Sequence, residues 1–481
     1  MAEQSLKDKT AKGLFWGGVS NGVQQLLGMV FGIYLARTLN AEDYGLVGML
    51  AIFTGVAGTI INSGFTVALT NKQEVTHKEY NAVFWFMVLA GLISYVILFF
   101  CSPLIASFYG RPELMSLSRV LFISFFFAGI AGVPYTVMFK NMMVKEQAKI
   151  DISALLISGI IGVLLAVCGL AYWALAIQSL AYVTISSLMK CIVSPWKPTL
   201  NIDFSPLRDM FSFSVKLFIT NIFTQINNNV FSVLLGRLYN AAQVGYYSQG
   251  NKWMTMGYQL FGGMIGGVAQ PLLVNVLDDV PRLLNVFRKM MRFGAFLSFP
   301  AMLGLAFVAN EFVLILLGDK WLPSVPFLQL FCIWGAFSYI WILYTNILII
   351  YGRSDIYMNG MILTGLGQLV MLIIMSKLGV LWMVVGYVFI NLFSLMGWHH
   401  YASRYIKLSC RIILKDTLPF IFLALCSFWG AWFAASLAET VYIRLILKIF
   451  VSALLYITLL WLLGANILKE CISFLLKKSC T

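Results

Sequence analysis

Residues 21–45 read NGVQQLLGMVFGIYLARTLNAEDYG, and residues 221–245 read NIFTQINNNVFSVLLGRLYNAAQVG. The two stretches align at an offset of 200 residues without a gap, and nine of their positions are identical. The identical pairs include an Asn, a Gln, an Arg and a second Asn, which chance matching between leucine-rich helices does not readily produce. We therefore interpret the chain as two copies of one duplicated unit.

The composition around this repeat is that of a membrane protein. The chain has 481 residues, of which 60% are hydrophobic and 11% charged, whereas a soluble domain is roughly 45–50% apolar and about 25% charged. This balance excludes soluble enzymes, nucleic-acid-binding proteins and secreted disulfide scaffolds. A bilayer span needs about 20 mostly apolar residues. We predict an all-α integral membrane protein with about fourteen transmembrane helices, near residues 13–38, 45–70, 80–109, 117–139, 151–169, 172–190, 212–236, 245–275, 293–317, 325–350, 357–376, 380–400, 417–436 and 445–465.

The basic residues alternate between the loops of these predicted helices. Of the 33 Lys and Arg residues, 24 fall in one set of alternate loops, 8 fall in the other set, and Lys252 lies inside a span. Cytoplasmic loops carry the excess of Lys and Arg. The charge pattern therefore predicts a multi-pass protein with both termini in the cytoplasm, and it explains the basic excess without nucleic acid as a partner.

The repeat predicts the domain organisation. Each copy contains six helices, an even number, so both copies have the same orientation and their pseudosymmetry axis runs along the membrane normal. We predict an N-terminal six-helix lobe at residues 1–211, a C-terminal six-helix lobe at 212–411, and an appended pair, helices 13 and 14, at 412–481.

Polar side chains recur at helical spacing in the first and seventh predicted helices, and more follow in the eighth. Because such side chains are costly against lipid, they face other helices or a water-filled cavity. We interpret them as lining a hydrated cleft between the lobes. The alternative is that the amides join neighbouring helices by hydrogen bonds. The predicted substrate cavity comprises Asn21, Gln25, Asn221, Gln225, Asn228, Asn251, Lys252 and Gln259.

Four basic residues are candidate partners for an anionic group. Lys252 is the only ionisable residue well inside a predicted span; it either meets an anionic substrate in the cleft or extends its ammonium to the outer interface. Lys216, Arg37 and Arg237 lie near helix ends and are candidate head-group cations. Interfacial anchoring is the alternative explanation for the two arginines.

The sequence lacks the features of an enzyme. No Asp or Glu lies deep within a predicted span, the eight cysteines are scattered, and there is no P-loop motif for nucleotides. We expect no catalytic residues, no metal site and no cofactor. An ion gradient or the membrane potential remains open as the energy source.

Four stretches carry a family resemblance: LARTLNAEDYGL at 35–46, FKNMMVKEQAKI at 139–150, PAMLGLAFVANEFV at 300–313 and GDKWLPSVPFLQLFC at 318–332. With them the chain resembles the polysaccharide exporter and flippase family of the Wzx type, and in particular its colanic acid exporter branch. This family belongs to the multidrug/oligosaccharidyl-lipid/polysaccharide flippase superfamily, which also contains the multidrug and toxin extruders.

The resemblance implies a protein of the bacterial inner membrane. It implies that an undecaprenyl-diphosphate-linked oligosaccharide, such as a repeat unit of O-antigen, capsule or exopolysaccharide, moves from the cytoplasmic to the periplasmic leaflet by alternating access. Amides supply hydrogen bonds to the sugar, and a diphosphate favours a cation such as Lys252 or Lys216. The polyprenyl tail stays in the lipid, and the last two predicted spans are one place where it can lie.

The expected partners are therefore the lipid-linked oligosaccharide and membrane lipids, with a polysaccharide polymerase and glycosyltransferases as candidate protein partners. Two alternatives remain open. One is a multidrug or small-molecule antiporter on the same scaffold, and the other is a non-transporting membrane scaffold for polysaccharide assembly.

Overall fold

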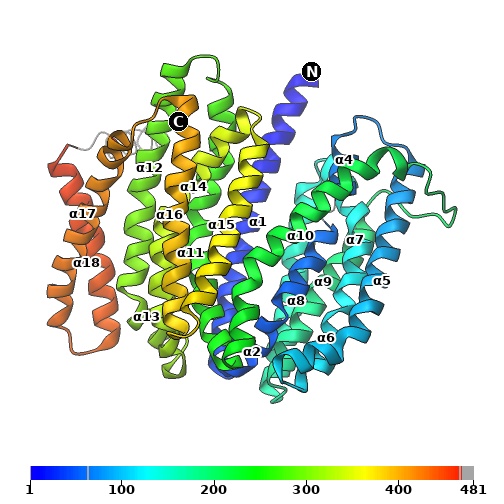
Figure 1. Cartoon of the computed structure of the whole chain (residues 1–481), viewed down its shortest axis with the longest axis horizontal. Coiled ribbons are helices and arrows are strands. Elements are labelled where there is room, and N and C mark those ends of the chain that lie inside the picture. Colours follow the sequence, from blue (N-terminus) through cyan, green and yellow to red (C-terminus); the bar gives the residue numbers. More distant parts are fainter. Residues whose placement is uncertain (1, 62–63, 465–466, 468–481) are drawn as a thin grey trace. The chain divides into compact units, whose positions relative to one another are not determined.

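The computed structural model describes residues 2–61, 64–464 and 467, and these residues form helices joined by turns and loops, the longest of them at 194–206 (Figure 1). Eleven helical segments of the described chain are long and apolar enough to cross a membrane. Three further helices, at Ala2–Thr38, Leu207–Leu238 and Ala241–Val274, are longer than 30 residues but less apolar. These three carry all of the amides of the predicted cavity. The predicted class, an all-α membrane protein with about fourteen spans, is confirmed.

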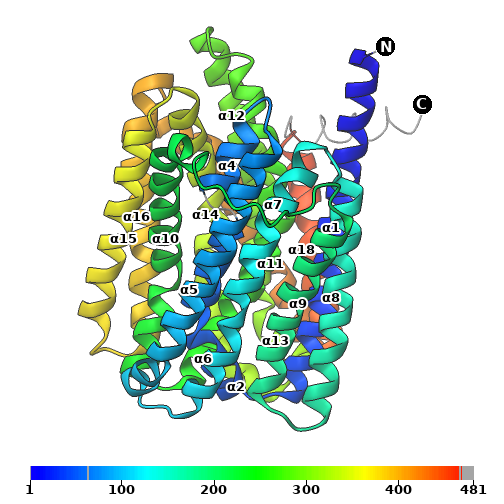
Figure 2. The same cartoon turned by 90° about the vertical axis from the view of Figure 1, so that its right-hand side faces the viewer.

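The chain divides into two compact units, the first of which comprises the described residues up to Gly245. Within it, α8 packs on α9, α5 on α7 and α1 on α8; α5 and α7 run side by side in both views (Figure 1, Figure 2). Its helices are α1 (Ala2–Thr38), α2 (Ala41–Met49), α3 (Ala51–Ile61), α4 (Gly64–Asn71), α5 (His77–Tyr109), α6 (Glu113–Leu121), α7 (Ile123–Lys140), α8 (Val144–Val167), α9 (Tyr172–Val193) and α10 (Leu207–Leu238).

The second unit begins at Tyr246, inside a helix that starts in the first. Its core is the packing of α12 on α14 and of α14 on α16, around the fully buried aromatic rings of Phe299, Phe331 and Tyr339. Its elements are α11 (Ala241–Val274), α12 (Val280–Phe307), α13 (Ala309–Leu316), the 3-10 helix η1 (Asp319–Ser324), α14 (Val325–Ile350), α15 (Ser354–Met375), α16 (Val380–Ile406), α17 (Cys410–Ser436) and α18 (Val441–Leu462).

The division after Gly245 lies later in the chain than the lobe boundary at 211 that the repeat suggests. The reason is α10, which packs along α3 and α4 and so belongs to the first compact unit. Compactness and repeat descent are different properties, so this grouping does not test the duplication. The lobes 1–211 and 212–411 remain a prediction.

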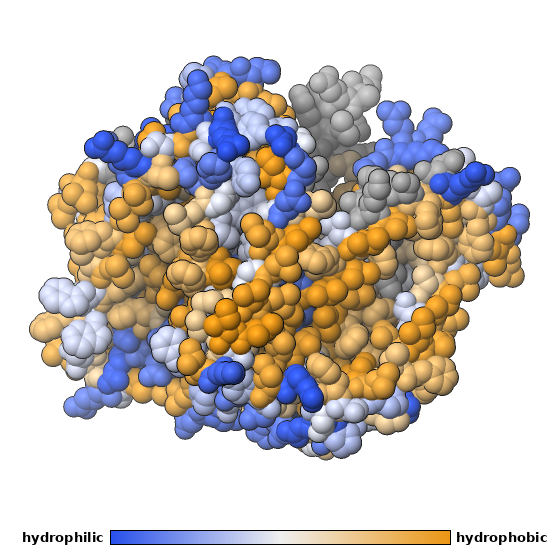
Figure 3. All heavy atoms as spheres, viewed as in Figure 1, coloured by the Kyte–Doolittle hydropathy of each residue, from blue (hydrophilic) through white to orange (hydrophobic). Residues whose placement is uncertain are grey.

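The surface of both units has the polarity that a bilayer requires. Orange, apolar residues cover the sides of the helices and blue, hydrophilic residues gather near the helix ends (Figure 3). The exposed apolar side chains include Phe100, 73% exposed on α5, and Trp429, 77% exposed on α17. Such faces are stable against hydrocarbon and unfavourable in water.

Two ion pairs, each with a buried carboxylate, attach α17 and α18 to the rest of the second unit. Arg288 of α12 donates to both oxygens of Asp416 in α17, from Nε at 2.7 Å and from Nη2 at 3.0 Å. Lys448 of α18 lies 2.7 Å from Glu311 of α13. The helix pair that the sequence places after the repeat is therefore held by specific charges as well as by apolar packing.

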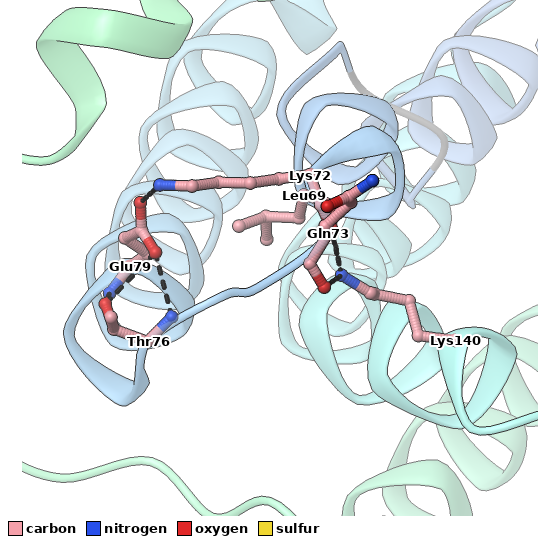
Figure 4. A network of polar contacts seen from close by, with 6 residues as sticks. All are labelled: Leu69, Lys72, Gln73, Thr76, Glu79 and Lys140. Carbon is pink, nitrogen blue, oxygen red and sulfur yellow. Dashed lines mark hydrogen bonds and ion pairs between the residues drawn. The ribbon is translucent and has the colours of Figure 1, made fainter.

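A network of polar contacts joins α4 to the start of α5 and the end of α7 (Figure 4). Glu79 of the first turn of α5 accepts from the backbone N–H of Thr76 at 2.8 Å and pairs with Lys72. The ammonium of Lys140, the last residue of α7, donates to the carbonyl oxygen of Leu69 at 3.2 Å. A cation at the C-terminal end of α4 is favoured by the helix dipole. Lysines counted for topology thus also fix the connection between two helices.

Candidate functional site

The amides of α10 divide into two sets with different surroundings. Gln225 and Asn229 are half-buried and turned toward α3. Asn229 Nδ2 donates to the carbonyl oxygen of Gln225 at 2.9 Å. A Cβ on Gly55 of α3 would lie 2.6 Å from Gln225 Oε1. The glycine therefore makes room for this amide, and here the row joins two helices, as the alternative interpretation expects.

The other set is open. Asn228 of α10 is exposed, as is Asn21 near the middle of α1, while Gln25 and Asn221 are half-buried. An exposed amide within a membrane helix is costly against hydrocarbon and favourable against water or a polar ligand. The two helices have different main packing partners, α8 for α1 and α3 and α4 for α10. The exposed members fit the cavity interpretation.

On α11 the predicted cavity residues are partly accessible. Asn251 and Lys252 are half-buried, and Gln259 is exposed. Within the described chain, the ammonium of Lys252 has neither an ion-pair partner nor a hydrogen-bond partner. By contrast, the buried lysines Lys190 and Lys448 are both paired with carboxylates, Asp151 at 3.1 Å and Glu311 at 2.7 Å. The side-chain nitrogen of Lys252 is therefore available to a ligand or to the interface.

Gln249 is one of the polar residues of the eighth predicted span but lies outside the predicted cavity set, and its burial without a partner makes it a further candidate. Its side chain is 1% exposed, and neither its amide nitrogen nor its amide oxygen has a partner among the described residues. Trp253, one helical turn further along α11, is also buried with an unpaired indole N–H. Buried polar atoms are almost always hydrogen-bonded in folded proteins. The Gln249 amide and the Trp253 indole N–H can therefore still form hydrogen bonds with a polar partner. In the sequence, Gln249 is one polar residue among several and has no distinguishing spacing.

The candidate head-group cations differ in the contacts that they make with the rest of the chain. Arg237 Nη1 donates to the carbonyl oxygen of Phe108 at 2.6 Å, and its guanidinium lies 5.4 Å from the ring of the same residue. This contact supports the anchoring explanation for Arg237. Arg37 is exposed in the last turn of α1. The side chain of Lys216 lies outside the described residues.

The buried carboxylates of the described chain are already neutralised. Those under 10% exposed are Glu311 and Asp416, and each is paired with a basic side chain. The described residues also contain no group of three or more His, Cys, Asp or Glu side chains that would hold a metal ion. The polar chemistry of the candidate cavity is therefore that of amides and one unpaired ammonium.

At one end of the first unit, the two repeat copies make a reciprocal contact. A Cβ on Gly45 of α2 would lie 1.7 Å from the carbonyl oxygen of Ala241, and a Cβ on Gly245 would lie 1.9 Å from the carbonyl oxygen of Ala41. Both pairs are related by the 200-residue offset. Reciprocal contacts of this kind are typical of a two-fold axis.

The sequence matches one family model. Residues 34–326 match the model described as polysaccharide biosynthesis protein. The chain is 25% identical over 338 residues to the lipopolysaccharide biosynthesis protein WzxC of Escherichia coli (strain K12), an alignment that covers 69% of this chain and 68% of that protein. It is 25% identical over 298 residues to the succinoglycan biosynthesis transport protein ExoT of Rhizobium meliloti (strain 1021), covering 62% of this chain and 60% of that protein.

The fold is that of solved transport proteins. The lipid II flippase MurJ in an inward closed conformation superposes with a TM-score of 0.77 at 16% sequence identity, covering 95% of this chain and 99% of that one. At this level of identity the likeness concerns the fold alone.

Proposed function

Since this chain belongs to the polysaccharide biosynthesis protein family, we propose that it is a flippase for a lipid-linked oligosaccharide. In this proposal an undecaprenyl-diphosphate-linked repeat unit moves from the cytoplasmic to the periplasmic leaflet by alternating access. Two relatives support it, because WzxC is a lipopolysaccharide biosynthesis protein and ExoT is a succinoglycan biosynthesis transport protein.

The observation that carries the proposal is the unpaired ammonium of Lys252 on a helix that also bears accessible amides. A phosphate or diphosphate is bound most strongly by charge-assisted hydrogen bonds from a cation. A sugar presents hydroxyl groups, which amides such as Asn251 and Gln259 match as both donors and acceptors. This combination suits a head group that is anionic at one end and a carbohydrate at the other.

The buried carboxylates make a multidrug antiporter the weaker alternative. A cationic drug and a coupling cation both favour a carboxylate without a partner, whereas Glu311 and Asp416 are held by Lys448 and Arg288. The proposed setting is the bacterial inner membrane with both termini in the cytoplasm. A polysaccharide polymerase and glycosyltransferases are the proposed protein partners, and an ion gradient or the membrane potential is the proposed energy source.

Deletion of the gene tests the proposal. We expect loss of a surface polysaccharide together with accumulation of undecaprenyl-linked oligosaccharide on the cytoplasmic side, both restored by the intact gene on a plasmid. Drug susceptibility is measured in the same strains. Increased susceptibility without accumulation of the lipid-linked sugar would instead identify an antiporter. A second strain contains the double variant Asn21→Leu with Asn228→Leu, which removes polar groups from the predicted cavity. Normal polysaccharide export in that strain would identify a scaffold.

A further inference from the structure

A groove lies between α15 and α16 in the second unit, and none of the amides described above lines it. Its cavity volume is about 320 Å³, within the range of small-molecule sites, about 300–1,000 Å³. The lining is almost entirely apolar. Apart from the polar atoms of its aromatic residues, its polar side-chain groups are the hydroxyls of Thr364 and Ser394. The groove is open along one side, where Leu363 is 73% exposed and Phe393 is 59% exposed.

Glycines create this groove. Gly367 of α15 and Gly397 of α16 both line it. A Cβ on Gly397 would have no heavy atom within 4 Å, so the space in front of it is empty of protein. At Gly360, by contrast, the ring of Trp398 packs directly against the glycine, and a Cβ added there would lie 2.6 Å from Trp398 Cη2. The two helices therefore pack closely at one glycine and leave a furrow at another.

One end of the groove leads to a cation. Tyr401 lines the groove, and the guanidinium of Arg404 lies 5.7 Å from its ring. Arg404 is exposed and its Nη2 lies 2.7 Å from Nε2 of His400. In the part of the chain that the structure describes, no carboxylate is paired with Arg404. The charge pattern predicts that this end of α16 is cytoplasmic.

We infer that this groove binds the isoprenoid chain of the lipid-linked substrate, with the first phosphate of the head group at Arg404. The inference rests on the proposed function. An apolar furrow that ends near a guanidinium without a carboxylate partner is complementary to a hydrocarbon chain that ends in a phosphate. A polyprenyl phosphate brings one chain to one phosphate, which matches one furrow and one cation, whereas a phospholipid brings two acyl chains. The tail then lies at α15 and α16, and not at the last two spans.

Binding to the purified full-length chain in detergent tests the inference, with native mass spectrometry as the readout. The probes are undecaprenyl phosphate, undecaprenol and phosphatidylglycerol. Gly397→Leu puts an apolar side chain into the furrow, where its Cβ would meet no heavy atom within 4 Å, and favours the helix. Arg404→Gln removes the cation. The controls are Leu366→Phe, which adds bulk at an exposed position of α15 outside the groove, and Lys407→Gln, which removes an exposed charge nearby.

We expect Gly397→Leu to weaken the binding of both undecaprenyl phosphate and undecaprenol at least about tenfold, because both compounds need the furrow. Arg404→Gln should weaken the binding of undecaprenyl phosphate by about tenfold, since a hydrogen bond to a charged group contributes on this scale. It should leave the binding of undecaprenol unchanged. Both controls should bind like the original chain.

Equal binding of all variants, or no binding to the original chain, would overturn the inference. The groove would instead be a phospholipid site if phosphatidylglycerol bound as tightly as undecaprenyl phosphate and if the same two variants lost that binding. These outcomes are separate from failure of the proposed function, which is detected in cells by the absence of accumulated lipid-linked oligosaccharide.

Discussion

Gly45 lies against Ala241 so closely that a Cβ on the glycine would be 1.7 Å from the alanine carbonyl oxygen. The partner contact, Gly245 against Ala41, has the corresponding distance of 1.9 Å. The sequence offset of 200 residues therefore reappears in space as a contact that maps onto itself when the two copies are exchanged. This geometry supports the duplication more directly than the nine identities do.

Gly45→Ala and Gly245→Ala should each destabilise the protein. The added methyl group must displace backbone, and overpacking of this kind costs about 1–3 kcal/mol. Thermal unfolding in detergent measures the effect. Gly58→Ala is the control, because a Cβ at Gly58 meets no heavy atom within 4 Å, and alanine there should be neutral or stabilising by about 0.5–1 kcal/mol. Equal stability of all three variants would contradict the close contact.

Leucine at Gln225 and at Asn228 should have different effects. Gln225 fills the space left by Gly55, so Gln225→Leu changes a helix contact and should lower thermal stability. Asn228 is exposed, so Asn228→Leu should leave stability unchanged and reduce polysaccharide export. The paired measurements are unfolding temperature and surface polysaccharide. Unimpaired export in a stable Asn228→Leu protein would remove this residue from the cavity.

Lys252→Ala should impair export more than Lys320→Ala. Lys252 is half-buried without a partner in the described chain, whereas Lys320 is an exposed residue of η1. Accumulated lipid-linked oligosaccharide in complemented deletion cells is the readout, and Lys252→Arg should retain more export than Lys252→Ala because it keeps the charge. Equal and mild effects of the two alanine variants would indicate that Lys252 only extends to the interface.

Removing one member of the buried pair Lys448–Glu311 should cost stability. The two side chains are 11% and 6% exposed, and breaking such a pair leaves an uncompensated buried charge worth about 3–5 kcal/mol. Glu311→Gln should therefore lower the unfolding temperature strongly, and a second change, Lys448→Met, should restore much of it. The matched control is the exposed pair Arg353–Asp355, 44% and 58% exposed, where Asp355→Asn should change the unfolding temperature little. A small effect of Glu311→Gln would show that the pair is not shielded from water.

The sequence proposes cavity residues but does not give their surroundings. Asn21 and Asn228 are exposed, and Lys252 has no partner among the described residues; their place in a cavity, which polar groups in apolar helices suggest, stays a prediction. The assignment of Gln225 to a helix contact depends on Gly55, which lies 170 positions earlier in the chain. Helical spacing places both amides on one side of α10 but does not say which of them meets another helix.

The sequence alone determined the membrane class and the approximate number of spans, and it predicts an orientation. These properties follow from local composition, because hydrocarbon requires about 20 apolar residues per span and loop charges set the topology. Only the tertiary structure decided which charges neutralise one another, such as Lys448 and Glu311 at a separation of 137 residues, and where two helices leave a furrow. Such contacts depend on the rotation and register of each helix against its neighbours, and helical periodicity does not specify either one.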